Sequence, residues 1–398
     1  MSELIKRSIE RLDQWLTKNG WAGYDPYDLK GLSFFTKGNP SLFEKALRKA
    51  IWKVDPFAPY LLRRVFRIKK EINSKAMGLF ADGYLTLYRI TGKQSYLSKA
   101  EEAMQWLDEN HSKGYSGKCW GYPFDWQSRI FIPRGTPSSV VSATVGNAYW
   151  NFYKTTGDDR YLSTCESICD FFVNDLNVDV LDSDKICFSY TPLDNFHVHN
   201  ANLFVAEFLI RIGREVGNEH FVDLGLHATN YVLSEQNPDG SICYWGKDQD
   251  NRCHLDHYHS GFEIRSLYSI WKLTGDERIH EAVERYYHFY LSNFFEDRTI
   301  PKLTPRSKYP INIHSCAEAL LCNATLTPDF PEGREYLANA TRWTIENMQD
   351  ERGYFYYMIR KVKDIEWKVK IPYIRWGQAW MIRALVCFLE LRKGRLEN

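Results

Sequence analysis

The chain contains 398 residues, of which 44% are hydrophobic and 25% are charged, and its formal net charge is +1. This composition is typical of a globular protein with a large apolar core. The small net charge argues against a broad field that would attract nucleic acid or an acidic membrane, so we expect neither as a partner. Aromatic residues make up 15% of the chain, which indicates either a thick core or a groove that stacks flat ligands.

The N-terminal stretch MSELIKRSIERLDQWL carries charges every few residues and therefore lacks the apolar region of a secretion signal. No stretch approaches the roughly 20 apolar residues that a membrane-spanning helix needs. The nine cysteines are scattered and form no CxxC pair, which predicts reduced, mostly buried thiols in a cytoplasmic protein. Because no Pro/Gly-rich linker interrupts the sequence, we expect residues 1–398 to form a single domain.

The first helices are predicted near Leu4–Leu16 and Leu42–Lys53. A phrase then returns about every 60 residues, as YRITGKQSYL, YKTTGDDRYL, GREVGNEHFV, WKLTGDERIH and the looser FPEGREYL. Helices with apolar periodicity run into the first four phrases, at Met77–Arg89, Val140–Tyr153, Asn202–Ile212 and Phe262–Leu273. Glycine then ends each helix, and a polar capping residue begins a second one. These second helices are predicted at Ser95–Glu109, Arg160–Val173, Glu219–Leu233 and Glu277–Phe294.

The two helices of each hairpin differ in polarity. The first is apolar or small on almost every side, as in SATVGNAYWNFY, which is typical of a buried helix. The second is charged along one side, as in ERIHEAVERYYHFY. This alternation predicts an all-α toroid in which an outer ring of helices wraps an inner ring. The last inner helix is predicted at Tyr373–Leu391, and the helices of residues 1–70 are expected to complete the outer ring, which gives six hairpins.

Glycine turns followed by aromatic runs connect the hairpins, as in QNPDGSICYW, QDERGYFYYM and HSKGYSGKCWGYPFDWQ. They predict short β-hairpins or extended loops on one face of the ring. Loops on a rigid scaffold commonly carry function, so we expect the active groove on this face.

The whole pattern, over about residues 70–395, resembles the (α/α)6-toroid superfamily of carbohydrate-active proteins. This group includes polysaccharide lyases, glucuronyl C5-epimerases, N-acylglucosamine 2-epimerases and unsaturated-glucuronide hydrolases. More narrowly, CWGYPFDWQSR, HNANLFVAEFL and LDHYHSGFEIRSLYSIWKLTGD resemble bacterial polysaccharide-cluster proteins of the VpsJ-like type. The resemblance implies the fold and a sugar context, and it does not imply a particular reaction.

Five polar clusters lie at or just before the starts of the predicted inner helices, so we expect them to converge on one end of the ring. In the first cluster, aromatic rings suit the apolar face of a sugar, while a carboxylate and a guanidinium suit its polar groups. A packed aromatic hairpin with one surface salt bridge is the alternative. The cluster consists of Trp120, Tyr122, Asp125, Trp126 and Arg129.

The second and third clusters are rich in histidine. His259 and Glu263 are four residues apart on one helix face, and an acid beside a histidine can tune it as a general base. The second cluster consists of Tyr190, Asp194, His197, His199, Asn200 and Asn202. The third consists of His254, Asp256, His257, Tyr258, His259 and Glu263.

The fourth and fifth clusters add cations that could hold an anionic sugar; solvated surface is the alternative for them. The fourth consists of Lys302, Arg306, Tyr309, Asn312 and His314. The fifth consists of Tyr373, Arg375, Trp376 and Gln378.

The leading hypothesis is an enzyme that abstracts the C5 proton of a uronate in a poly- or oligosaccharide, as a lyase or an epimerase. Such an enzyme needs a base, an acid on the other face and groups that neutralise the carboxylate. The expected base is His259 or His199, next to Asp256 and Glu263, and the expected acid is Tyr258 or Tyr190. The expected carboxylate clamp consists of Arg375, Arg129 and Asn200.

Three alternatives stay open. A glycoside hydrolase would use two carboxylates from Asp125, Asp194, Asp256 and Glu263. A glycan-binding protein of a polysaccharide assembly system would need the aromatic residues but not the histidines. A zinc site could draw on His197, His199, Cys253, His254, Asp256, His257 and His259. No HExxH motif supports the zinc site, so we expect no metal and no cofactor.

Overall fold

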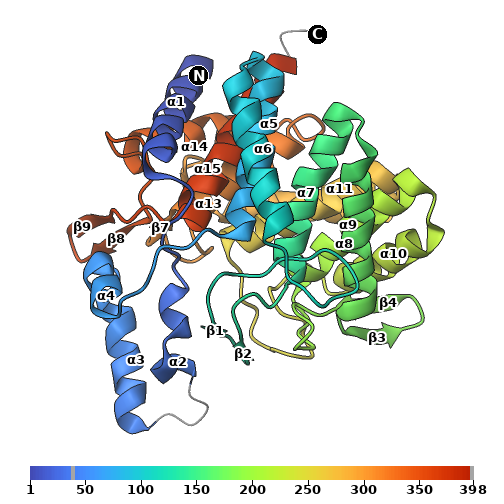
Figure 1. Ribbon diagram of the computed structural model, residues 1–398, viewed down its shortest axis with the longest axis horizontal. Helices are drawn as coiled ribbons and strands as arrows, with labels where there is room; N and C mark the ends of the chain where they lie inside the picture. The colour runs from blue at the N-terminus through green and yellow to red at the C-terminus, as the bar shows by residue number, and fades with distance from the viewer. Residues whose placement is uncertain (37–40, 395–398) are drawn as a thin grey trace.

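Six inner helices form a closed ring in the computed structural model, which describes residues 1–36 and 41–394 (Figure 1). Each inner helix packs against the next one in chain order, and the last packs against the first. The inner helices are α5 (Ser74–Thr91), α7 (Ser139–Thr156), α9 (His199–Val216), α11 (His257–Thr274), α13 (Ile313–Leu326) and α15 (Trp380–Gly394). The predicted all-α toroid is therefore confirmed.

An outer helix follows each of the first five inner helices and packs against it. These outer helices are α6 (Gln94–Glu109), α8 (Asp159–Asp175), α10 (Glu219–Ser234), α12 (Glu277–Asn293) and α14 (Gly333–Met348). The sixth inner helix, α15, has α1 (Ser2–Asn19) as its partner, so the start of the chain packs against its end.

The other N-terminal helices lie outside the ring. They are η1 (Asp28–Gly31), α2 (Ser33–Thr36), α3 (Leu42–Val54) and α4 (Pro59–Val65), and they hang below the ring at the lower left of Figure 1. A small apolar cluster of their own, centred on Leu29, Phe35 and Ile51, holds them together. We expected the helix that begins at Leu42 in the outer ring, and this expectation is wrong because its apolar side packs on that separate cluster.

Left-handed glycines make the short turns of the hairpins possible. Gly92, Gly157, Gly217 and Gly275 each follow an inner helix with φ between 70° and 73°, a conformation that glycine adopts without steric cost. The fifth phrase behaves differently, because α13 already ends at Leu326 and Gly333 begins α14.

Short antiparallel strands lie in the segments that connect the helices of the ring. They pair as β1 (Trp126–Gln127) with β2 (Phe131–Ile132), β3 (Val178–Asp182) with β4 (Lys185–Phe188), and β5 (Phe295–Glu296) with β6 (Ile300–Pro301). A three-stranded sheet has the order β7 (Ile311–Asn312), β8 (Met358–Val362) and β9 (Ile365–Val369). The QNPDGSICYW segment forms a loop with a single bridge from Trp245 to Val198, which agrees with the expected loop and not with the alternative of a β-hairpin.

The last inner helix begins with a π-helical turn, η2 (Ile374–Ala379), before α15 proper. Such wide turns are rare and frequently occur at functional sites. None of the helices within residues 1–36 and 41–394 has the length and apolar character needed to cross a membrane.

Candidate active site

The inner helices all begin at the same end of the ring, which we call the mouth. The residue before each helix often caps it with a side chain: Asn73 accepts a hydrogen bond from the backbone of Lys75, Asn312 from that of His314. Such caps satisfy backbone N–H groups that have no partner within the helix. The capping residues therefore fix the first helical turns, which carry the candidate site residues.

An aspartate–histidine pair lies at the start of α11. The Asp256 carboxylate caps the helix by accepting the His259 N–H at 3.0 Å and pairs with His259 Nδ1 at 2.6 Å. This contact places the Nδ1 proton towards Asp256 and leaves Nε2 as the basic nitrogen. In the described part of the chain Nε2 has no hydrogen-bond partner, and the side chain is 21% exposed. A histidine oriented in this way can act as a general base through Nε2.

Aromatic rings surround this histidine. The Tyr244 ring lies 4.3 Å from the His259 ring and the Tyr258 ring lies 4.4 Å from it, between centroids. Burial raises the pKa of Tyr258 well above its ordinary value, so its hydroxyl stays protonated. A protonated phenol next to a base is a candidate proton donor.

A second histidine, His314 on α13, is fully enclosed at the mouth. Tyr258 stacks on its ring at 4.6 Å and Trp376 meets it edge-on at 4.5 Å. Both ring nitrogens are buried without a partner among the described residues. Burial, followed by the charges of Lys75 and Arg375, lowers the pKa of His314 well below its ordinary value. The imidazole is therefore neutral, with two unsatisfied nitrogens that a bound ligand could satisfy.

Lys75 adds a buried amine at the same end of the ring. The residue is 3% exposed, and its Nζ lies 5.5 Å from the Phe262 ring and 5.3 Å from the Trp380 ring. Burial lowers the pKa of Lys75 well below its ordinary value. An arriving carboxylate would favour the charged amine, so this position suits an anionic ligand.

Arg375, in the π-helical turn, lies between the aromatic rings and the N-terminal segment. Asp25 binds it through two hydrogen bonds of 2.6 and 2.7 Å. Its guanidinium lies over the rings of Tyr27, Tyr122 and Trp376. Because Asp25 and Tyr27 come from the N-terminal segment, that segment covers part of the mouth.

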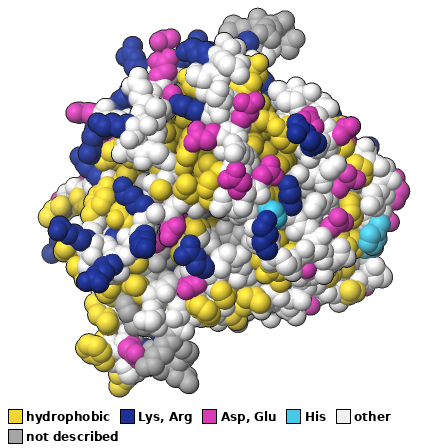
Figure 2. Space-filling model, in the orientation of Figure 1, with side chains coloured by type: hydrophobic (Ala, Val, Ile, Leu, Met, Phe, Trp, Pro, Cys, Tyr) yellow, Lys and Arg dark blue, Asp and Glu magenta, His cyan; other side chains and the backbone are white. Residues whose placement is uncertain are grey.

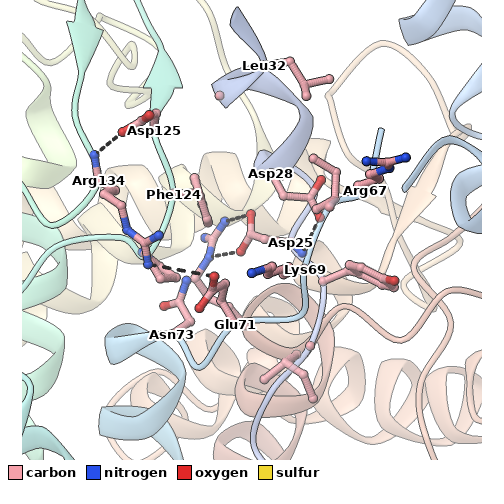
Figure 3. Close-up of a pocket in the computed structure, with 17 residues that line it drawn as sticks. Asp25, Asp28, Leu32, Arg67, Lys69, Glu71, Asn73, Phe124, Asp125 and Arg134 are labelled. Carbon is pink, nitrogen blue, oxygen red and sulfur yellow. Dashed lines mark hydrogen bonds and ion pairs between the residues drawn. The ribbon is translucent and has the colours of Figure 1, made fainter. Parts of the chain in front are cut away.

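An open cavity of about 380 Å³ borders Arg375 (Figure 3). Asp25 and Asp125 lie on its wall, and the Arg134 and Glu71 side chains approach to 3.8 Å across it. His259 is not among the residues that line this cavity. The volume is within the range of ligand pockets in proteins.

The structure thus brings parts of all five predicted clusters together. Tyr27 stacks on Trp126 at 6.2 Å and meets Trp376 at 5.4 Å, while Tyr190 lies 6.1 Å from Trp126. The predicted residues that share the mouth are Tyr122, Trp126, Tyr190, Asp256, Tyr258, His259, His314, Arg375 and Trp376, and Asp125 lines the adjoining cavity.

Several predicted binding residues lie elsewhere. Trp120 is buried in the core, where its Nε1 donates to the Leu107 carbonyl. Arg129 lies outside, over the Trp245 ring. Asp194 accepts backbone hydrogen bonds within its own loop, from Tyr190, Thr191 and Phe196. His197 pairs with Asp179 at 2.8 Å. These side chains build the loops of the mouth and do not line it.

Three predicted residues face outer helices or loops. His199 Nδ1 is 2.6 Å from the Cys243 carbonyl, and its ring packs on Tyr231 of α10. His257 Nδ1 is 2.9 Å from the Lys302 carbonyl. Glu263 accepts a 2.6 Å hydrogen bond from Tyr286 of α12, and burial raises its pKa well above the ordinary value. The predicted pairing of Glu263 with His259 is therefore wrong, because the two side chains have different partners.

Asn200 keeps a buried Oδ1 without a partner among the described residues.

The residues considered for zinc do not converge. Within residues 1–36 and 41–394, no three histidine, cysteine, aspartate or glutamate side chains are arranged to hold a metal ion. Cys253 is instead bonded to Cys243 in a disulfide, which corrects the expectation that all thiols are reduced. Disulfides persist mainly in oxidising compartments, so this bond does not support the predicted cytoplasmic location. That location stays a prediction.

The disulfide closes the loop that carries Tyr244 and Trp245. Replacing Cys253 by serine is expected to lower the free energy of unfolding by about 2–3 kcal/mol, because an 11-residue loop is no longer closed in the unfolded chain. Urea unfolding with and without a thiol reductant measures this effect. The reductant should destabilise the wild type and leave Cys253→Ser unchanged; a wild type insensitive to the reductant would contradict the prediction.

The buried histidines predict an acid-sensitive fold. Burial lowers the pKa of His199 to about 4 and that of His257 to about 3. Unfolded histidines titrate near 6.5, so below that pH the unfolded state binds more protons and stability falls. We expect a loss of roughly 3 kcal/mol or more between pH 7 and pH 4.5. Urea unfolding at a series of pH values measures this loss. The free energy of unfolding of His199→Asn/His257→Asn should fall less steeply with decreasing pH than that of wild type, while that of the exposed-site variant His220→Asn should fall as steeply as wild type. An equal dependence of the free energy of unfolding on pH in all three proteins would contradict the assignment of the acid sensitivity to His199 and His257.

Four residues of the mouth were missed: Asp25, Tyr27, Lys75 and Tyr244. Lys75 had a signal, because Asn73 and Lys75 have the same spacing as Asn312 and His314 at a helix start. The other three lie in loops, and only the fold shows where they point.

Comparison with known proteins identifies the fold. No family model matches the chain, and no curated protein matches its sequence significantly. An unsaturated glucuronyl hydrolase specific for heparin superposes with a TM-score of 0.63 at 12% identity, over 99% of both chains. A glycoside hydrolase family 76 mannosidase from Bacteroides thetaiotaomicron gives 0.64 at 10% identity, over 99% of this chain and 100% of that one.

The cellobiose 2-epimerase from Bacillus thermoamylovorans gives a TM-score of 0.61 at 13% identity, over 81% of this chain and 88% of that one. All three are carbohydrate-active enzymes with the (α/α)6 toroid, so the chain has this fold. The narrower resemblance to VpsJ-like proteins stays a prediction.

Proposed function

We propose that the protein is a carbohydrate-active enzyme that abstracts a proton from a uronate residue of a poly- or oligosaccharide. The observation that carries this proposal is the Asp256–His259 contact of 2.6 Å at the mouth of the ring. It supplies a base oriented by a carboxylate, in a setting of aromatic rings that suit a sugar.

The proposed reaction begins at C5 of the uronate. His259 Nε2 takes the C5 proton, and the electron pair moves into the carboxylate to give an enolate-like state. Positive charge next to that carboxylate stabilises the state. Arg375, over the Trp376 ring, carries this charge. Lys75, whose pKa burial lowers, would take up a proton when the carboxylate arrives and add to it.

Tyr258 is the proposed acid. If it returns a proton to C5 from the opposite face, the product is the C5 epimer. If the group on C4 leaves instead, with a proton from the tyrosine, the product is an unsaturated uronate. Either outcome uses the protonated phenol that burial maintains.

Lys69 and Arg67 support an acidic substrate. Both line the cavity beside Arg375 (Figure 3). In the described part of the chain, neither side chain forms an ion pair. Both cations are therefore available to an acidic substrate in this cavity, whose lining also includes the carboxylates of Asp25, Asp28, Glu71 and Asp125.

The alternative of a glycoside hydrolase has fewer available carboxylates. Asp194 and Glu263 are engaged in internal hydrogen bonds, which leaves Asp125 and Asp256 of the four considered. The unsaturated glucuronyl hydrolase and the mannosidase above are hydrolases with the same fold. The assays below therefore measure hydrolysis as well as proton abstraction.

A panel of uronate-containing oligosaccharides, assayed for three products, tests the proposal. A lyase generates an ultraviolet-absorbing unsaturated end, an epimerase incorporates solvent deuterium at C5, and a hydrolase generates only new reducing ends. The first or second result supports the proposal. New reducing ends without unsaturation or deuterium would overturn it, and so would binding of oligosaccharides without turnover.

A further inference from the structure

A segment outside the ring exposes an unusual density of apolar and basic side chains. This segment, which we call the basic arm, consists of residues 41–70 and contains α3 and α4. The hairpin of β8 and β9 lies beside it, because the Phe57 and Trp367 rings stack at 4.8 Å. Figure 2 shows hydrophobic side chains on the lowest lobe of the molecule, and hydrophobic and basic side chains together on the left side above it.

The apolar side chains of the basic arm are strongly exposed. Leu42 is 84% exposed, Phe43 76% and Phe57 66%. Leu61 and Val65 on α4 are exposed as well, and so are Val362 and Ile365 at the tip of the hairpin. Large exposed apolar side chains that gather in one part of a protein mark an interaction site.

The fold does not use these side chains for its own core. The arm already has an apolar cluster of Leu29, Phe35 and Ile51, against which Leu47 and Leu62 pack. A capping box formed by Ser41 and Glu44 begins α3, so the helix is built by local interactions. The exposed side of the arm is therefore a separate surface on an already folded element.

The positive charge of the basic arm favours an anionic partner. Residues 41–70 contain nine lysines and arginines and two acidic residues, a net charge of +7, whereas the whole chain has +1. One of the two acids, Asp55, is buried against Arg63. Lys45, Lys49 and Lys53 are exposed along α3, and their spacing from Leu42 places all four on one side of the helix.

Interfacial helices combine these two features. Apolar side chains enter the boundary between head groups and acyl chains, while lysines and arginines bind anionic head groups. Nucleic acid would use the cations but not the large aliphatic side chains. A second copy of the chain would bring another +7 surface against the first, which is electrostatically unfavourable.

We infer that the basic arm binds the surface of an anionic lipid membrane, with α3 and α4 lying in the interface. Because Arg67, Ile68 and Lys69 at the end of the arm also line the cavity at the mouth, binding would place the mouth next to the membrane. The inference rests on exposure and charge, and it is independent of the proposed reaction.

Co-sedimentation of the full chain with lipid vesicles tests this inference. The chain should sediment with vesicles of phosphatidylcholine and phosphatidylglycerol at low ionic strength and not with phosphatidylcholine alone. Salt should release it, because surface charges are screened. Lys49→Glu/Lys53→Glu should weaken binding at least tenfold, since each basic residue near an anionic surface contributes about 1 kcal/mol. Leu42→Ser/Phe43→Ser should weaken it at unchanged charge.

A matched control separates the arm from overall charge. Lys6→Glu/Lys93→Glu changes the net charge equally at the other side of the molecule, and it should bind as the wild type does. Circular dichroism confirms that each variant is folded. Three results would overturn the inference: no binding to anionic vesicles at low salt, equal loss in the control pair, or a lipid-free dimer that Leu42→Ser/Phe43→Ser dissociates. Retention on a nucleic acid homopolymer that Leu42→Ser/Phe43→Ser leaves unchanged would overturn it as well.

Discussion

Replacing His259 by alanine is expected to lower kcat by about 10²- to 10⁴-fold on a confirmed substrate, because a positioned general base contributes on this scale. Asp256→Asn should lower kcat by less than His259→Ala. Asparagine caps a helix as well as aspartate does, so this variant removes the carboxylate that orients the imidazole and leaves the helix start intact. Steady-state kinetics over a range of pH measures both effects.

Glu263→Gln is the matched control for this prediction. Glu263 lies one turn after His259 on α11, but its carboxyl group accepts a hydrogen bond from Tyr286 and burial raises its pKa well above the ordinary value. Glutamine keeps the shape and an acceptor oxygen, so kcat should stay within about twofold of wild type. A full loss in Glu263→Gln together with an active His259→Ala would show that the base is wrongly assigned.

Replacing Arg63 by methionine is expected to lower the free energy of unfolding of the N-terminal segment by about 3–5 kcal/mol, because it leaves buried carboxylates without their counter-charge. Arg63 is fully buried, and its guanidinium binds Asp28 through 2.8 and 2.9 Å hydrogen bonds and Asp55 through one of 2.7 Å. It also donates to the Asp25 carbonyl at 3.1 Å.

The same substitution should reduce activity, since Asp25 holds Arg375 at the mouth. Hydrogen exchange of residues 24–68 and urea unfolding measure the change in stability. Arg64→Met is the control, because Arg64 is the exposed neighbour on the same helix, and it should change stability by no more than about 0.5 kcal/mol. Equal effects of the two substitutions would contradict the importance of the buried network.

Sequence periodicity predicted the ring well because it reports burial directly. An inner helix such as α7 is apolar on almost every side, and an outer helix such as α12 is charged on one side, so each helix could be assigned to its layer. The left-handed glycines at Gly157 and Gly275 marked the turns. The helix at Leu42 was misplaced because its amphipathic pattern is the same whether it packs on the ring or on a separate cluster.

The sequence predicted that the candidate site lies at the starts of the inner helices. It did not predict which role each residue has there. Spacing along α11 places His259 and Glu263 on one face, but it does not say which of them turns towards the mouth and which towards Tyr286. Asp25 and Arg375 are 350 residues apart, and no local pattern connects them. The net charge of +1 for the whole chain also does not report its distribution, since residues 41–70 alone carry +7.

Exchange of the C5 proton with solvent is the most direct test of the central claim, which is that His259 at the mouth removes this proton. The substrate is incubated in deuterium oxide with wild type, Asp256→Asn and His259→Ala, and C5 is followed by nuclear magnetic resonance alongside ultraviolet absorbance. We predict deuterium at C5, or loss of the C5 proton into an unsaturated product, at a rate that falls from wild type through Asp256→Asn to His259→Ala. Turnover by the wild type with the C5 proton fully retained would contradict the account.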